Sequence, residues 1–174
     1  MRPSRSPICN LRAVFSMNVT TQITIQYSRA KLGEMEECAR RAKPYESCAL
    51  LFGTKFPAPN PSKTSTQVVY SVERVDCIPS SRLSEVSFVI EDYETFLERW
   101  KAADALGLKL VGVYHSHPAP AAPSGTDKQN MLWMDESNFK FAVWVIQSML
   151  KHHATNAFIY TQNQFFKVPI QIIE

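Results

Sequence analysis

The chain has 174 residues, of which 45% are hydrophobic, and its 19 basic and 16 acidic side chains give a formal net charge of +3. This size fits one globular domain with an ample core, and so mild a charge, without Lys/Arg runs, argues against nucleic-acid and membrane-surface partners. Because the longest apolar run is far shorter than the ~20 residues needed to cross a bilayer, we expect a soluble, cytoplasmic protein.

The N-terminal segment contains basic residues but no acidic one before Glu34. A targeting peptide is conceivable there, but Asn10 and Arg12 interrupt the apolar stretch that a secretory signal requires. We therefore expect residues 1–17 to be a disordered extension and a single domain to occupy residues 18–174.

The first half of the chain predicts strands around one helix. Residues 19–27 alternate in the period of two that is typical of a strand. Ser28 is a suitable N-cap for a helix over 29–43, where apolar residues return at i, i+3 or i+4. Gly53 should close the next strand, and the proline-rich stretch 57–63 should be a loop. Further strands in this half are predicted at 46–53, 66–78 and 86–90.

The second half predicts two helices among further strands. Residues 91–107 form an amphipathic pattern that begins with acidic residues and ends at Gly107, as a helix does. A second helix is expected from about 123 to 136. The strands of this half are predicted at 109–115, 141–147, 156–161 and 165–173. Since helices and strands interleave around one central sheet, the fold class is α/β or α+β.

The four cysteines are widely spaced and form no C-x-x-C pair. Such spacing fits neither a disulfide framework nor a cysteine-rich zinc site. We therefore expect four separate thiols in a reducing compartment. The residues concerned are Cys9, Cys38, Cys48 and Cys77.

The stretch VGVYHSHPAPAAPSGTD contains the side chains that indicate chemistry. His115 and His117 are i, i+2, so in a strand they point the same way. Ser124 and Asp127 are i, i+3, which places them on one face of a first helical turn. The short loop 118–123 is stiffened by its prolines, so two imidazoles and a carboxylate can converge.

Two histidines and one carboxylate suit Zn²⁺, and three protein ligands that leave a fourth position for water are typical of catalytic zinc. Each part has a simpler interpretation on its own. An isolated H-x-H is more often a surface or packing feature, and S-x-x-D alone is a helix-capping pattern. The combination is much rarer, and capping is compatible with metal binding. Ser116, between the histidines, should face away from them as a structural residue.

The motifs HSHP and PSGTD, together with "ESCALLFG" at 46–53, resemble the JAMM (MPN+) zinc metalloproteases. This family includes the deubiquitinase of the proteasome lid and small prokaryotic relatives, and the resemblance spans roughly residues 20–173. Ala49 stands where glycine is common, and the loop 118–123 is one residue shorter than usual, which favours an archaeal or bacterial type. The resemblance implies a single MPN domain, with a curved mixed sheet flanked by helices as in cytidine deaminases.

The resemblance also implies roles for individual residues. His115, His117 and Asp127 would hold one Zn²⁺ per chain. Glu46 would be the general base, and Ser124 would donate a hydrogen bond to the oxyanion. Cytidine-deaminase chemistry would need a P-C-x-x-C motif, which the chain lacks, and an amidohydrolase would need a barrel of about 250 residues.

The function implied by the family is an isopeptidase that cleaves ubiquitin or ubiquitin-like proteins from conjugates after their Gly-Gly tail, with proteasome components as further partners. An alternative is a peptidase that processes the C-terminus of a sulfur-carrier protein, and a third is a non-catalytic MPN scaffold. The resemblance places the tail-binding edge at 79–88, where an extended tail could add as a strand. The substrate-binding residues expected there are Arg82, Leu83, Ser84, Glu85 and Val86.

Overall fold

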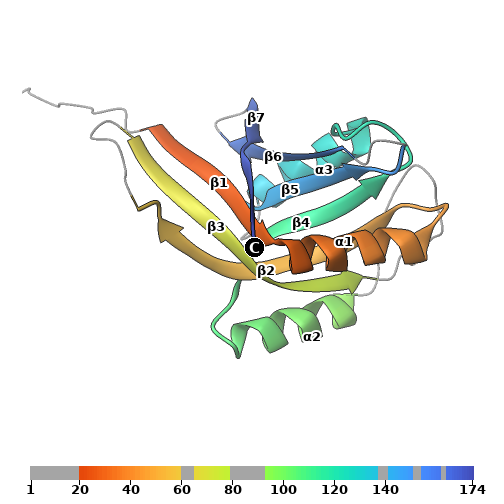
Figure 1. Cartoon of the computed structure of the whole chain (residues 1–174), viewed down its shortest axis with the longest axis horizontal. Helices are drawn as coiled ribbons and strands as arrows, with labels where there is room; N and C mark the ends of the chain where they lie inside the picture. Colours follow the sequence, from red (N-terminus) through yellow and green to blue (C-terminus); the bar gives the residue numbers. More distant parts are fainter. Residues whose placement is uncertain (1–19, 60–64, 79–92, 137–140, 151–153, 162–163) are drawn as a thin grey trace, which may run out of the picture.

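In a computed structural model, the described residues are 20–59, 65–78, 93–136, 141–150, 154–161 and 164–174. They form one sheet with three helices packed on it (Figure 1). In chain order the elements are β1 (Thr20–Ser28), α1 (Arg29–Ala42), β2 (Ser47–Pro57), β3 (Ser65–Ile78), α2 (Tyr93–Asp104), β4 (Lys109–His117), α3 (Gly125–Glu136), β5 (Val143–Ser148), β6 (Thr155–Thr161), β7 (Gln164–Val168) and β8 (Ile170–Ile173).

The sheet is mixed, with the strand order β7-β6-β5-β4-β2-β3-β1-β8. Three neighbouring pairs are parallel (β1 with β3, β1 with β8, and β4 with β5), and the others are antiparallel. The two edge strands, β7 and β8, are joined through Pro169 alone, so the edges of this curved sheet must lie close together. This nearly closed sheet with flanking helices confirms the expected fold class.

The two faces of the sheet are covered by different helices. On β2, Ala49 and Leu51 belong to the core cluster that contains the buried face of α1. Leu50 and Phe52 alternate with them and pack in a second cluster with Phe96 of α2. Successive strand residues point to opposite faces of the sheet. The two clusters therefore show which face of the sheet each side chain of β2 and its neighbouring strands occupies.

Most predicted elements are found with small shifts of their ends. The N-cap of α1 is Ser28, whose Oγ accepts a hydrogen bond from the backbone N–H of Lys31 at 3.3 Å, as the sequence predicts. No helix in the described residues is long and apolar enough to cross a membrane. The extension expected at 1–17 and the strand expected at 86–90 lie outside the described residues.

The prediction that Gly53 closes its strand is wrong, because β2 continues to Pro57, which was expected in a loop. Gly53 lies where the register between β2 and β3 shifts, which is a β-bulge or irregularity. A Cβ atom at this position would come within 1.7 Å of the carbonyl oxygen of Ser71. Glycine is therefore required for close backbone approach between two strands and not for a turn.

The single strand predicted at 165–173 is also divided. Pro169 separates β7 from β8, and these strands form the two opposite edges of the sheet, where β7 pairs with β6 and β8 pairs with β1. Pro169 has no backbone N–H to donate, but its carbonyl oxygen accepts from the N–H of Ile25 at 3.0 Å. The proline thus marks the point where the chain crosses from one edge to the other.

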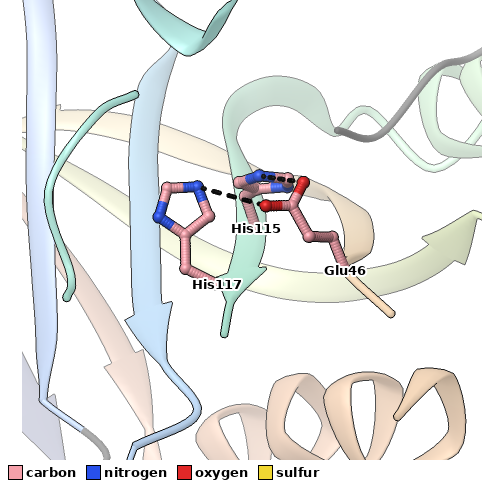
Figure 2. Close-up of side chains that lie close together, drawn as sticks. All are labelled: Glu46, His115 and His117. Atoms are coloured by element: carbon pink, nitrogen blue, oxygen red, sulfur yellow. Dashed lines mark ion pairs between the residues drawn. The ribbon is translucent and has the colours of Figure 1, made fainter. Parts of the chain in front are cut away.

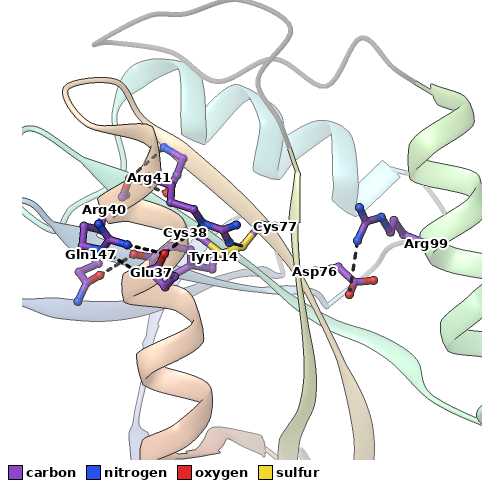
Figure 3. The surroundings of a disulfide bond; sticks show 11 residues. Glu37, Cys38, Arg40, Arg41, Asp76, Cys77, Arg99, Tyr114 and Gln147 are labelled. Carbon is purple, nitrogen blue, oxygen red and sulfur yellow. Dashed lines mark hydrogen bonds and ion pairs between the residues drawn. A yellow bond between two sulfur atoms is a disulfide. The ribbon is translucent and has the colours of Figure 1, made fainter.

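The expectation of four separate thiols is wrong for Cys38 and Cys77, which form a disulfide between α1 and β3 (Figure 3). Their Cα atoms are 5.8 Å apart. Their separation of 39 residues in the sequence gave no indication of pairing. The inference of a reducing compartment rested on unpaired cysteines and loses that support. Cys48 is a free, buried thiol.

Candidate functional site

The two histidines of the HSHP motif end the central strand β4 and point to the same side of the sheet (Figure 2). Their ring centroids are 4.7 Å apart, with the ring planes at 83°. Both residues are buried, with 4% of the surface of His115 and 3% of that of His117 exposed. The strand therefore brings two imidazoles to one point, as the i, i+2 spacing predicts.

Asp127 reaches the same point from the first turn of α3. Ser124 precedes this helix, and its Oγ accepts a hydrogen bond from the N–H of Asp127 at 3.1 Å. In return, Asp127 Oδ2 accepts from the N–H of Ser124 at 2.8 Å, so the pair forms a capping box that fixes the carboxylate. Asp127 Oδ2 lies 3.1 Å from His117 Nε2, and Oδ1 lies 3.5 Å from His115 Nε2.

Glu46 approaches the histidines from the start of β2. Because β2 runs antiparallel to β4, with Ser47 opposite Ser116, the beginning of one strand meets the end of the other. Glu46 Oε2 lies 3.2 Å from His115 Nε2, and Oε1 lies 3.8 Å from His117 Nε2. The ligand atoms of these three residues all lie within 4.8 Å of one another (Figure 2).

The proline-rich loop orients one of the imidazoles. His117 Nδ1 lies 3.4 Å from the carbonyl oxygen of Pro120, a contact that directs Nε2 towards the carboxylates. Asn156 of β6 donates from Nδ2 to the carbonyl oxygen of Ala121 at 2.8 Å and anchors this loop. The contact of Asn156 joins residues 35 apart and no motif surrounds this residue, so the sequence alone gives no signal for its role.

The electrostatics of the cluster favour a carboxylate at Asp127. Burial by itself would raise the pKa of Asp127, but the contact with His117, the charge of His115 and both hydrogen bonds with Ser124 lower this pKa to about 2. For His117, burial would lower the pKa, but Asp127 and Glu46 together raise it above its ordinary value. Two buried carboxylates thus attract positive charge to the imidazoles.

The cluster has the donor set of a zinc site. His117 Nε2 and Glu46 Oε2 are buried, and the short contacts of these two atoms with Asp127 and His115 lack the alignment of a hydrogen bond. Buried polar atoms in native proteins are normally partnered, and a cation between them would satisfy both. Imidazole nitrogens and carboxylate oxygens are the ligands that Zn²⁺ accepts. The residues present therefore fit a zinc ion, with Asp127 or Glu46 as the third ligand beside the histidines.

Cys48 also belongs to this side of the sheet, because it lies directly opposite His115 in the pairing of β2 with β4. Burial raises the pKa of its thiol well above the ordinary value, and the charge of Asp127 raises it further. The thiol therefore stays protonated beside the carboxylates. The substrate-binding residues expected at 82–86 lie outside the described residues.

The curved mixed sheet with flanking helices is the fold expected of an MPN-type domain. The family described as prokaryotic homologs of the JAB domain matches residues 29–160, more than half of the chain. The chain therefore belongs to this family, which confirms the resemblance.

Three known proteins are similar to this chain to different degrees. A Thermus thermophilus protein described as a probable TtuB-protein conjugate cleaving protease is 38% identical over 63 residues, which cover 36% of this chain and 43% of that protein. A solution structure from Desulfitobacterium hafniense has a TM-score of 0.64 and 25% identity, covering 87% of this chain and 94% of that one. The structure of a JAB1/MPN domain protein from Archaeoglobus fulgidus has a TM-score of 0.48 and 21% sequence identity. The match covers 86% of this chain and 98% of that one. The chain thus matches less than half the length of the Thermus protein.

Proposed function

We propose that the chain is a zinc-dependent peptidase that cleaves conjugates of a prokaryotic ubiquitin-like protein. The observation that carries this proposal is the buried convergence of His115, His117, Asp127 and Glu46 at the meeting point of three elements. A non-catalytic scaffold would have no need of two buried carboxylates beside two imidazoles, since each costs desolvation energy.

In this proposal the histidines and Asp127 hold the metal. Zinc, when bound, would act as a Lewis acid and lower the pKa of a water molecule from about 15.7 towards 7. Asp127 suits a ligand because its capping box holds it in place. Glu46 suits the general base because its Oε2 has no hydrogen-bond partner and can accept a proton.

The remaining steps concern the proton and the carbonyl group. Glu46 takes the proton from water at Oε2 and passes it to the leaving amine, so water adds across the C–N bond and yields a carboxylate and a free amine. Ser124 Oγ accepts from the N–H of Asp127, and its own hydroxyl hydrogen stays available for the carbonyl oxygen of the substrate. A donor of this kind contributes about 3–4 kcal/mol to transition-state stabilisation.

One relative supports the proposed substrate class. The Thermus protein is described as acting on TtuB-protein conjugates, which favours a prokaryotic ubiquitin-like substrate over ubiquitin itself. This name therefore supports the hypothesis of a peptidase for a sulfur-carrier protein better than the hypothesis of a deubiquitinase. None of these relatives is named as a proteasome component, and the proposal contains none.

The test compares leaving groups on one ubiquitin-like protein. The zinc-loaded chain is incubated with three substrates: that protein joined to a lysine side chain, the same protein with a C-terminal peptide extension, and a ubiquitin conjugate. Mass spectrometry identifies the released C-terminus. We expect cleavage after Gly-Gly of the first or second substrate, loss of activity with a chelator, and recovery when zinc is returned.

The Glu46→Gln variant is the matched control for a contaminating protease, because its surface is unchanged. Cleavage that persists in this variant, or in the presence of the chelator, would assign the activity to something other than the proposed site. A zinc-loaded wild type that cleaves none of the three substrates would overturn the proposed function.

A further inference from the structure

Ser47 and Ser116 form a buried pair of hydroxyl groups between β2 and β4. They are direct partners in the antiparallel register. Their Oγ atoms lie 2.8 Å apart, within hydrogen-bonding distance. Ser116 Oγ also accepts a hydrogen bond from the backbone N–H of Ser47 at 2.9 Å. Ser47 is 4% exposed and Ser116 is 0% exposed, so water does not compete for these bonds.

The pair lies on the face of the sheet opposite the candidate site. Ser116 stands between His115 and His117 on β4, and successive strand residues point to opposite faces. Ser47 follows Glu46 directly in the chain. The serines can therefore influence the site only through the backbone.

The backbone connection leads to Glu46. The N–H of Ser47 belongs to the peptide group that begins at the carbonyl carbon of Glu46, and β2 begins only at Ser47. Before Glu46 the chain turns, with the N–H of Tyr45 bonded to the carbonyl oxygen of Ala42 at 2.9 Å. Ser116 Oγ therefore holds the peptide group of Glu46 where the regular strand begins. The hydroxyl group that accepts this hydrogen bond belongs to Ser116, the residue between the two histidines.

We propose that Ser116 is a positioning residue, which fixes the Glu46 carboxylate relative to the metal ligands by holding the peptide group that follows it. The inference rests on the proposed role of Glu46 as general base. A displacement of about 1 Å in a catalytic group can lower the rate about 10²-fold, so one backbone hydrogen bond has a measurable effect.

Ser47→Ala is the matched control for Ser116→Ala. Both variants remove one buried hydroxyl and the bond between the two Oγ atoms. Ser47→Ala keeps the bond from its own N–H to Ser116 Oγ, whereas Ser116→Ala removes it. A purely structural role predicts similar losses in both variants, whereas positioning predicts a loss in Ser116→Ala alone.

The first experiment measures kcat and KM of the zinc-loaded variants on the ubiquitin-like conjugate that the wild type cleaves. It is done at a temperature where circular dichroism shows all variants folded. We expect Ser116→Ala to lower kcat about 10²-fold with unchanged KM and zinc content, and Ser47→Ala to stay close to wild type. Adding Ser116→Ala to Glu46→Gln should cost nothing further, since both changes act on the same base. Wild-type kcat in Ser116→Ala, equal losses in both alanine variants, or additive losses with Glu46→Gln would each overturn the proposal.

The second experiment does not depend on activity. In protein loaded with paramagnetic Co²⁺ in place of zinc, the shifts of the Glu46 side-chain NMR signals report its position relative to the metal. We expect these shifts to change in Ser116→Ala and not in Ser47→Ala. Unchanged shifts in Ser116→Ala would overturn the positioning role. A wild type without activity on any conjugate would instead defeat the proposed function, and the cobalt shifts would still decide the role of Ser116.

Discussion

At the scale of single residues, two carboxylates compete for the same pair of imidazoles. Glu46 Oε2 lies 3.2 Å from His115 Nε2, and Asp127 Oδ2 lies 3.1 Å from His117 Nε2, so distance alone does not separate ligand from base. The hydrogen bonds around each carboxylate distinguish the two proposed roles. Asp127 is held by two hydrogen bonds with Ser124, whereas Glu46 Oε2 has no hydrogen-bond partner.

This difference predicts that Asp127→Asn loses zinc. The amide keeps the size of the side chain but removes the charge that the metal requires. Metal analysis after dialysis should show far less than one zinc per chain, and the melting temperature should lie close to that of the metal-free wild type. Full zinc content in Asp127→Asn would make Glu46 the third ligand.

The companion prediction is that Glu46→Gln keeps its zinc and loses its chemistry. An amide of nearly the same shape cannot accept a proton, so kcat should fall about 10²–10⁴-fold while KM stays the same. Steady-state kinetics on the cleaved conjugate, with zinc measured in the same sample, provide the check. A kcat within tenfold of wild type would show that another group is the base.

The motif residues could be predicted from the sequence because their spacing fixes their geometry. An i, i+2 pair on a strand and an i, i+3 pair at a helix start converge wherever the connecting loop is short. The contacts of Ser116 and Asn156 could not be predicted. They depend on the register between β2 and β4 and on the packing of the loop against β6, which no local pattern specifies.

At the scale of elements, periodicity predicted most strands and helices, and the errors have specific physical causes. The sequence predicts that Gly53 ends its strand, but this glycine permits close approach of β3 at an irregularity within β2. Pro169 lies inside an apolar run and divides it between two edges of the sheet. In both cases a residue that usually ends a strand takes part in the pairing of strands in the sheet.

The disulfide between α1 and β3 leads to a prediction about stability. Cys38 and Cys77 are 39 residues apart, and a crosslink over a loop of this length is expected to contribute about 3–4 kcal/mol to the free energy of unfolding. The double variant Cys38→Ser/Cys77→Ser should therefore melt roughly 6–16 °C below the oxidised wild type. Thermal unfolding followed by circular dichroism measures the difference.

The control for this prediction is the wild type treated with a reducing agent, which should melt close to the double variant. The double variant itself should not respond to the reducing agent. Equal melting temperatures for oxidised and reduced wild type, with oxidation verified by mass spectrometry, would show that the bond contributes little to folding.

At the scale of the whole molecule, the site joins three parts of the chain that are far apart in sequence. Glu46 precedes β2, the histidines end β4, and Asp127 begins α3. These parts meet because β2 and β4 are adjacent in the centre of the sheet and the loop 118–123 is short. A metal ion bound at this point would bind the folded chain only, since the unfolded chain does not bring these side chains together.

Removal of the metal should therefore lower the stability of the whole domain. At a free zinc concentration 100 times the dissociation constant, binding contributes about 2.7 kcal/mol, which corresponds to a rise of roughly 5–11 °C in melting temperature for a chain of this size. Melting curves of the wild type with added zinc and with a chelator measure this difference. The Asp127→Asn variant should melt at the same temperature under both conditions, because it lacks the carboxylate charge that we propose holds the metal. If the wild type has the same melting temperature with zinc and with the chelator although its zinc content differs, the metal does not stabilise the folded domain.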